Sequence, residues 1–318
     1  MISIIIPAYN IGNYIKNCLD SVRQQTYTDY EVIVVNDGST DDTLSVLNSY
    51  KDEYHDFPLS IIDKSNGGVT AARRDGFLSS KGEWICFMDG DDVLPLEALH
   101  KLINSSTSDI DIVCGSYQTF DETGVVELKK INVIPGIYDN ESLLDIMLLG
   151  KYNSAPWAKI IRKRCISLSV FSIPPKITNK EDVIMNYRIN SSIKGSVSFI
   201  QDVVYNYRIN RTDSAFSKKY IKGKKLNLTY ELDVLNLYFF DLLNNKDFVV
   251  NHQKTLSVFS YNCLWYFHKY FYSITSDYKK EIKKIYDAVR IKDIDETLIK
   301  KFIKFVILLV NLKRYRIL

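Results

Sequence analysis

Short apolar runs alternate with amphipathic stretches over the first part of the chain. Runs rich in Ile and Val fall at residues 2–6, 31–35, 59–62, 84–88 and 111–115. Apolar side chains at helical spacing connect them at residues 14–23, 43–50, 69–78 and from about Pro95 onward. This alternation predicts βαβ units that form an α/β fold, a mostly parallel central sheet with helices on both faces.

The pattern changes twice further along the chain. Residues 116–216 mix strand-like and helical segments: strands are expected at 125–128 and 197–207, and helices at 140–149 and 181–190. From residue 217 onward, only long, aromatic-rich helical periodicity recurs. We therefore expect an α/β domain over 1–216, composed of the halves 1–115 and 116–216, and a helical C-terminal region over 217–318.

Charge and cysteine usage exclude several classes of protein. The 41 basic and 38 acidic residues give a net charge of +3, which does not favour a nucleic-acid partner. Five cysteines without a CxxC pair favour a reducing compartment over a disulfide framework. We find neither a signal-peptide pattern nor a run of about 20 apolar residues. These features predict a cytoplasmic protein that does not span a bilayer.

Polar residues follow three of the predicted strands. They are Pro7-Ala8-Tyr9-Asn10, Asn36-Asp37-Gly38-Ser39 and Asp89-Gly90-Asp91-Asp92. Each could be a turn or a helix cap by itself. Because open α/β sheets bind ligands at the carboxyl ends of their strands, their coincidence favours a ligand crevice.

Three carboxylates in four residues suggest a metal site. Asp89, Asp91 and Asp92 are hard oxygen donors that suit Mg²⁺ or Mn²⁺, and a solvated acidic turn before the next helix is an equal alternative. Neither GxGxxG nor GxxxxGK[ST] is present, so a phosphate would be held otherwise. The segment 66–74, with Asn66, two glycines and two arginines, offers a helix N-terminus or simply a helix start with solvated arginines.

Several segments, in order, resemble the family 2 inverting glycosyltransferases of the GT-A fold. They are SIIIPAYN at 3–10, VIVVNDGSTDDT at 32–43, NGGVTAAR at 66–73, FMDGDD at 87–92, PWAK at 156–159, KEDVIMN at 180–186 and YNYRINRTDS at 205–214. Together they extend over about two thirds of the chain. Two departures from the family pattern, Arg74-Asp75 and Asn210, concern phosphate binding.

The resemblance implies a role for each matching residue on the donor side. Asp37 would accept the imide N–H of uracil against the Pro7–Tyr9 turn, which indicates UDP. Asp89 would hold the ribose or the metal, and Asp91 would bind Mn²⁺ or Mg²⁺ bridging the phosphates. The remaining nucleotide-binding positions implied are Ala8, Asn10, Asn66, Arg73, Gly90 and Arg211.

On the acceptor side the resemblance points to an acidic pair and to Trp157 with Lys159. Asp182 matches the base that removes the acceptor proton, with Glu181 orienting the acceptor or the helix. The pair could instead cap its helix, since acidic residues favour a first turn. Trp157 would form a wall against a sugar face, and core packing is an equal alternative.

The resemblance therefore implies a metal-dependent transferase that moves a hexosyl or N-acetylhexosaminyl group from a UDP-sugar to a carbohydrate acceptor. Bacterial members of the family suggest a lipid-linked acceptor in capsule, exopolysaccharide or O-antigen synthesis. The alternatives are a catalytically idle sugar-nucleotide-binding or scaffold subunit and a nucleotidyltransferase. The basic, amphipathic segment 298–318 could lie on the anionic inner face of the cell membrane or pack against the catalytic domain or a second subunit.

Overall fold

The fold is taken from a computed structural model, which describes residues 1–210 except 130, 150, 153–154, 175–176 and 178–180. The described residues of 1–144 and 151–210 belong to one compact unit. Arg211, the expected helical region 217–318 and its basic segment lie outside the described residues. In the described part of the chain, no helix is long and apolar enough to cross a bilayer.

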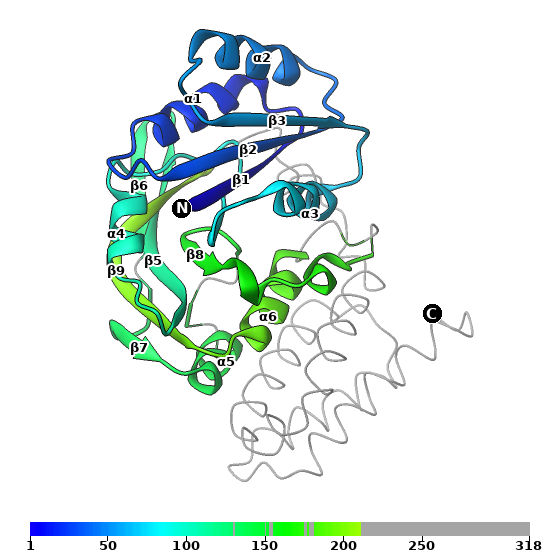
Figure 1. The fold of residues 1–318 in the computed structure, drawn as a ribbon. Coiled ribbons are helices and arrows are strands. Elements are labelled where there is room, and N and C mark those ends of the chain that lie inside the picture. The colour runs from blue at the N-terminus through cyan, green and yellow to red at the C-terminus, as the bar shows by residue number, and fades with distance from the viewer. Residues whose placement is uncertain (130, 150, 153–154, 175–176, 178–180, 211–318) are drawn as a thin grey trace, which may run out of the picture. The chain divides into compact units, whose positions relative to one another are not determined.

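The described residues form one nine-stranded mixed sheet (Figure 1). Its order is β3-β2-β1-β4-β8-β5-β9-β7, with β6 on the distal part of β5. The strands are β1 (Ile2–Ala8), β2 (Tyr30–Asp37), β3 (Leu59–Lys64), β4 (Trp84–Phe87), β5 (Ile110–Asp121), β6 (Gly124–Lys129), β7 (Gly136–Tyr138), β8 (Lys159–Arg162) and β9 (Ser196–Arg208). β6, β7 and β8 run against the other strands, so the sheet is mostly parallel, as expected.

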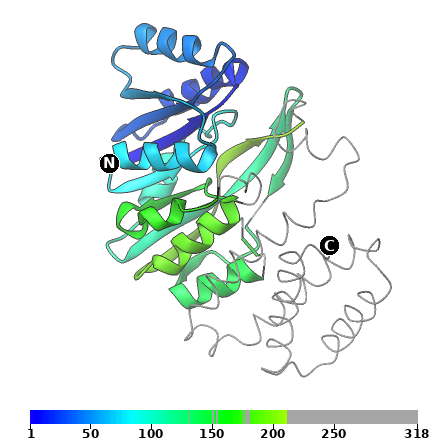
Figure 2. The same cartoon turned by 90° about the vertical axis from the view of Figure 1, so that its right-hand side faces the viewer.

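Helices cover both faces of the sheet, because the central strands are apolar on both sides. The α-helices are α1 (Gly12–Arg23), α2 (Thr43–Glu53), α3 (Val69–Ser79), α4 (Ala98–Asn104), α5 (Asn140–Leu148) and α6 (Glu181–Ser192). Two 3-10 turns, η1 (Lys163–Cys165) and η2 (Leu168–Phe171), follow β8. α1, α2 and α4 contribute to the core around Ile4 and Val34, whereas α3 packs on Ile33 and Val35. η2 contacts both α3 and α6, so it connects these two helices (Figure 2).

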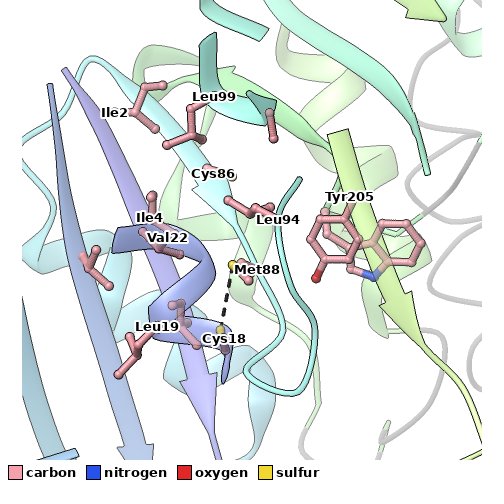
Figure 3. Packing of buried hydrophobic residues seen from close by; sticks show 14 of the residues in the cluster. Ile2, Ile4, Cys18, Leu19, Val22, Cys86, Met88, Leu94, Leu99 and Tyr205 are labelled. Atoms are coloured by element: carbon pink, nitrogen blue, oxygen red, sulfur yellow. Dashed lines mark hydrogen bonds between the residues drawn. The ribbon is translucent and has the colours of Figure 1, made fainter. Parts of the chain in front are cut away.

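Close packing of α1 on the sheet fixes the strand ends that form the site. Cys18 of α1 lies against Met88, directly after β4, with their sulfur atoms 3.9 Å apart (Figure 3). Ile15 and Leu19 on the same helix are fully buried. Burying a side chain of this size stabilises the fold by roughly 1.5–3 kcal/mol. The turn after β4 therefore begins on a rigid part of the core.

Three features of the sheet differ from the sequence-based expectation. β8 and β7 were not predicted, because a four-residue Lys-Ile-Ile-Arg strand and a three-residue strand carry too short a pattern. β5 continues past Gly115, where the pattern suggested an end. A Cβ atom at Gly115 would lie 2.5 Å from Val204, so glycine permits the close approach of β5 and β9 rather than ending the strand.

Candidate active site

The strand order places three polar strand ends at one edge of the sheet. β1 lies between β2 and β4 and runs parallel to both, with Ala8 paired with Asn36 and Ile5 with Phe87. The turns after Ala8, Asp37 and Phe87 therefore leave the sheet side by side, as the sequence predicts.

The turn after β1 is tied to the loop after β2. Asn10 has a left-handed backbone (φ 52°), which asparagine tolerates better than most residues. Its Oδ1 accepts a hydrogen bond from the Thr40 N–H (2.8 Å), and its own N–H donates to Ser39 Oγ (3.0 Å). Ala8 is buried, Pro7 is partly buried, and half of the Tyr9 surface is exposed. An exposed ring on a fixed turn is suited to stacking on a nucleobase.

Asp37 is buried and well compensated. The backbone N–H groups of Gly67 and Gly68 donate to its two carboxylate oxygens at 2.8 Å each, and Lys64 Nζ lies 3.3 Å from Oδ1. The side-chain amide of Asn66 donates to the Asp37 carbonyl (2.9 Å). The predicted donor-side residues Asp37 and Asn66 are therefore in direct contact.

Arg73 connects the donor side to α6. Its side chain is almost completely buried, Nη2 donates to Asp89 Oδ1 (2.9 Å), and Nη1 lies 4.0 Å from Glu181 Oε1. Nε and Nη1 have no hydrogen-bond partner among the described residues. Arg74, in contrast, is half exposed and pairs with Asp75. Buried donors without acceptors are costly, so this guanidinium is suited to receive an anion.

Glu181 and Asp182 form the first turn of α6, beside Arg73. Burial raises the pKa of the Asp182 carboxyl above its usual value, and the charge of Arg73 opposes that rise. Burial likewise raises the pKa of Glu181, with Arg73 opposing it and Asp182 adding to it. A carboxylate with a raised pKa is a stronger base, which suits proton abstraction near neutral pH.

The turn after β4 concentrates negative charge. Asp92 is fully buried, and burial followed by the charges of Asp91 and Asp89 raises its pKa well above the usual range. Asp89 is about 30% exposed and Asp91 is partly exposed. A Cβ atom at Gly90 would lie 2.4 Å from the end of the Ile11 side chain and 3.2 Å from that of Ile15, so glycine lets the turn pack closely against the start of α1.

This donor set fits Mg²⁺ or Mn²⁺ held by few protein ligands. Within the described residues, no group of three or more His, Cys, Asp or Glu side chains is arranged around a common metal position. Asp89 and Asp91 are nevertheless accessible hard ligands in a turn with excess negative charge. A cation held by one or two carboxylates and completed by substrate phosphates is usual for Mg²⁺.

Comparison with known families agrees with this geometry. The model of glycosyl transferase family 2 matches residues 3–167, about half of the chain. The chain belongs to glycosyl transferase family 2. The matched range includes the turns of Asn10, Asp37 and Asp89, and it ends before Glu181 and Asp182.

Relatives of this family 2 chain include enzymes with known substrates. It is 32% identical over 198 residues to a poly(ribitol-phosphate) beta-glucosyltransferase of Bacillus spizizenii, covering 61% of this chain and 30% of the relative. The first curated relatives are matched over only 21% to 58% of their length.

Solved structures confirm the GT-A fold. S. aureus TarS 1–349 in complex with UDP-GlcNAc is 20% identical, with a TM-score of 0.56 over 81% of this chain and 80% of the TarS 1–349 chain. A Pyrobaculum calidifontis mannosyltransferase in complex with GDP-Man and Mn²⁺ has the same TM-score at 13% identity, over 95% of this chain and 84% of that enzyme.

In this family 2 chain, Trp157 and Lys159, which were predicted to bind the acceptor, are both buried. Trp157 stacks on Tyr205 (4.7 Å between ring centroids) and on Tyr207 (5.3 Å). Lys159 of β8 points into the interior, where Nζ donates to the Tyr152 hydroxyl (3.0 Å) and lies 3.4 Å from Asn186 Oδ1. Both side chains therefore pack in the interior of the described part of the chain, Trp157 against tyrosines of β9 and Lys159 beside Tyr152.

Two residues that contact the turn Asp89–Asp92, called the acidic turn below, were not identified from the sequence. Tyr205 hydrogen-bonds Asp92 and the backbone of Asp89, and Arg208 contacts Asp91 and Asp92. They lie in the segment 205–214, from which only Arg211 was selected. The alternating aromatic residues at the end of β9 were the available signal, but the pattern does not reveal their partners.

Proposed function

We propose that this chain is an inverting glycosyltransferase that moves a sugar from a UDP-sugar to a carbohydrate acceptor. The observation that carries the proposal is the position of Arg73, which contacts Asp89 on the donor side and Glu181 on α6. The first turn of α6, which carries Glu181 and the proposed base Asp182, therefore lies beside the edge that would hold the departing nucleotide.

The chemistry needs only one protein base. The acceptor hydroxyl oxygen attacks the anomeric carbon as the bond from that carbon to the UDP phosphate oxygen breaks. Asp182 accepts the hydroxyl proton, and UDP leaves with the bonding electron pair. Glu181 orients the acceptor or the turn of α6. Arg73, two of whose nitrogens have no hydrogen-bond partner among the described residues, binds the negative charge that develops on the diphosphate.

On the donor side, Asp37 and the Pro7–Asn10 turn would hold uridine, with Asn66 fixing the loop around it. Asp89 and Asp91 would hold Mn²⁺ or Mg²⁺, which offsets charge on the leaving diphosphate when bound. Gly90 allows the turn its position against α1. UDP is supported by TarS, which was solved in complexes with UDP and with UDP-GlcNAc. The transferred group would accordingly be a hexosyl or N-acetylhexosaminyl residue.

We further propose that the acceptor is a saccharide on a lipid carrier, used in polysaccharide synthesis at the inner face of the cell membrane. By its name, the poly(ribitol-phosphate) beta-glucosyltransferase relative transfers glucose to a poly(ribitol-phosphate) polymer. The basic segment 298–318 would contact anionic lipid, or else a second copy of the chain. Flotation with anionic vesicles, comparing the full chain with one truncated before residue 298, separates these alternatives.

A donor panel tests the proposal. UDP-glucose, UDP-galactose, UDP-GlcNAc and UDP-GalNAc are incubated with Mn²⁺ or Mg²⁺, with and without a saccharide acceptor, and UDP release is measured. We expect release from one donor that depends on the metal and rises with acceptor. A chain that binds UDP but never releases it from any donor would be an idle binding subunit, and release of pyrophosphate from a nucleoside triphosphate would indicate a nucleotidyltransferase.

A further inference from the structure

The acidic turn after β4 is held by β9, far away in the sequence. Asp92 is fully buried, and its Oδ2 accepts a hydrogen bond from the Tyr205 hydroxyl (2.7 Å). The same hydroxyl oxygen accepts a hydrogen bond from the backbone N–H of Asp89 (3.0 Å). Figure 3 shows Tyr205 on β9 beside the loop that follows β4. One phenol group therefore connects the first and last aspartates of the turn.

Arg208 adds two further bonds to the same turn. Its backbone N–H donates to Asp92 Oδ1 (2.7 Å), and its Nε donates to the Asp91 carbonyl (2.8 Å). The guanidinium lies over the ring of Phe120 at 4.4 Å. All three aspartates are thus bonded to β9, Asp89 through its amide, Asp91 through its carbonyl and Asp92 through its carboxylate.

The contacts leave different tasks to the three carboxylates. Both oxygens of Asp92 bond to β9, so Asp92 fixes the shape of the turn. Asp89 and Asp91 contribute backbone atoms to these bonds, and both residues are partly exposed; the Asp89 carboxylate also accepts a hydrogen bond from Arg73. Tyr205 is itself held by Trp157, whose indole stacks on its ring at 4.7 Å and 6°. A ligand pair is useful to a metal only if its supporting groups hold it in place.

We propose that Tyr205 and Asp92 are positioning residues that set how Asp89 and Asp91 present their carboxylates to a divalent cation. This inference rests on the proposed metal-dependent function. If so, the hydrogen bonds among Tyr205, Asp92 and the Asp89 amide help to determine the metal affinity. They do not affect nucleotide binding by Asp37, which lies on another strand end.

Tyr205→Phe is the direct test, because it removes the hydroxyl and keeps the ring that stacks on Trp157. Tyr117→Phe is the matched control: Tyr117 packs edge-on against the same indole at 4.9 Å and takes no part in the bonds to the turn. Two measurements are made on each variant. Hydrogen exchange of the Asp89 amide is followed in the ligand-free protein, and Mn²⁺ affinity in the presence of UDP is measured by calorimetry.

We expect Tyr205→Phe to speed exchange at Asp89 and to weaken Mn²⁺ binding roughly 10- to 100-fold, the usual cost of losing a group that supports metal ligands. The same calorimetry without metal should give an unchanged UDP affinity, and Tyr117→Phe should match the native protein in hydrogen exchange and in both affinities. Exchange at Asp89 that does not change would overturn the inference, whether or not UDP binds. Faster exchange with unchanged Mn²⁺ affinity would also overturn it.

The two proposals fail in different ways. If the native protein shows no Mn²⁺-dependent UDP binding, both the proposed function and the inference are contradicted. If the native protein binds Mn²⁺ and UDP, the results on the variants decide the inference. If Tyr205→Phe does not fold, Asp92→Asn decides in its place, since it keeps the size of the side chain but leaves one accepting oxygen for the two donors, the Tyr205 hydroxyl and the Arg208 N–H. The same two results are then required of Asp92→Asn.

Discussion

Two clusters at the same edge of the sheet differ in how completely their charges are compensated. The Asp37 carboxylate receives two backbone N–H bonds and the Lys64 ammonium. Around Arg73, burial raises the pKa of Glu181 and Asp182 even though the guanidinium opposes it, and two guanidinium nitrogens have no hydrogen-bond partner in the described part of the chain. The first cluster is complete by itself. The second has an imbalance of the kind found at functional sites.

From this difference we infer that the two clusters serve different stages of the proposed reaction. A compensated carboxylate is a fixed recognition element, because its geometry does not depend on a ligand. An uncompensated group costs stability in the free protein, and a ligand or a proton can relieve that cost. The predictions below test this division, and they are ordered by the size of the expected effect.

Asp182→Asn should break the second cluster's chemistry without affecting the first cluster. Sugar transfer should fall by roughly 10²- to 10⁴-fold, the usual contribution of a general base, while UDP affinity stays close to native. Initial rates and calorimetry on the same preparations check this. Glu181→Gln should cost less, and Asp52→Asn, an exposed carboxylate on α2, should cost nothing. Transfer at the native rate by folded Asp182→Asn would make Glu181 the next candidate.

Asp37→Ala should damage the first cluster in two ways. A hydrogen bond to a charged group is worth about 1.5–3 kcal/mol, so the preference for UDP over other nucleoside diphosphates should fall roughly 10- to 100-fold. The variant should also be less stable, because it leaves the Gly67 and Gly68 N–H groups without their acceptor. Competition binding and thermal unfolding measure the two effects. An unchanged nucleotide preference would remove Asp37 from base recognition.

Arg73→Gln should move the pH profile of transfer. Arg73 lowers the pKa values of Glu181 and Asp182 against the effect of burial, so its loss lets both rise further. A base with a higher pKa is deprotonated only at higher pH, and the acid limb of the rate profile should move upward. Arg74→Gln, on the exposed neighbour, is the matched control. An acid limb that stays in place, or moves to lower pH, contradicts the assignment.

The smallest effect is a gain of stability in Asp182→Asn. A carboxyl whose pKa is raised by folding destabilises the native state once it ionises, so the isosteric amide removes that cost. The gain should be absent below the unfolded pKa of about 3.9, appear as pH rises from there through the raised folded pKa, and stay constant above it. Urea unfolding at several pH values measures it. A loss of stability at neutral pH would mean that the amide fails to replace the carboxylate's contacts.

Local sequence patterns predicted most of the fold and the three polar strand ends that meet at one edge of the sheet. β1, β2 and β4 were predicted because strands buried on both faces are near-continuous apolar runs, and the turns after them are polar segments. β8 was missed because its end residues are charged, with Arg162 lying over Trp84 and pairing with Glu83.

The support of the acidic turn could not be predicted in the same way. Tyr205 and Arg208 contact residues 113 to 117 positions earlier, so no pattern along the chain links them. Trp157 and Lys159 show a related limit. A sequence identifies an aromatic or basic residue in a family segment, but its burial follows from tertiary packing, here against Tyr205 and around Tyr152.

The central proposal is that a divalent cation held by Asp89 and Asp91 strengthens the binding of uridine diphosphate. Calorimetric titration of UDP with and without Mn²⁺, on the native protein and Asp91→Asn, tests it most directly. We predict that Mn²⁺ strengthens UDP binding to the native protein and has little effect on Asp91→Asn, while both bind UDP equally without metal. Equal strengthening by Mn²⁺ in the two proteins would contradict the account.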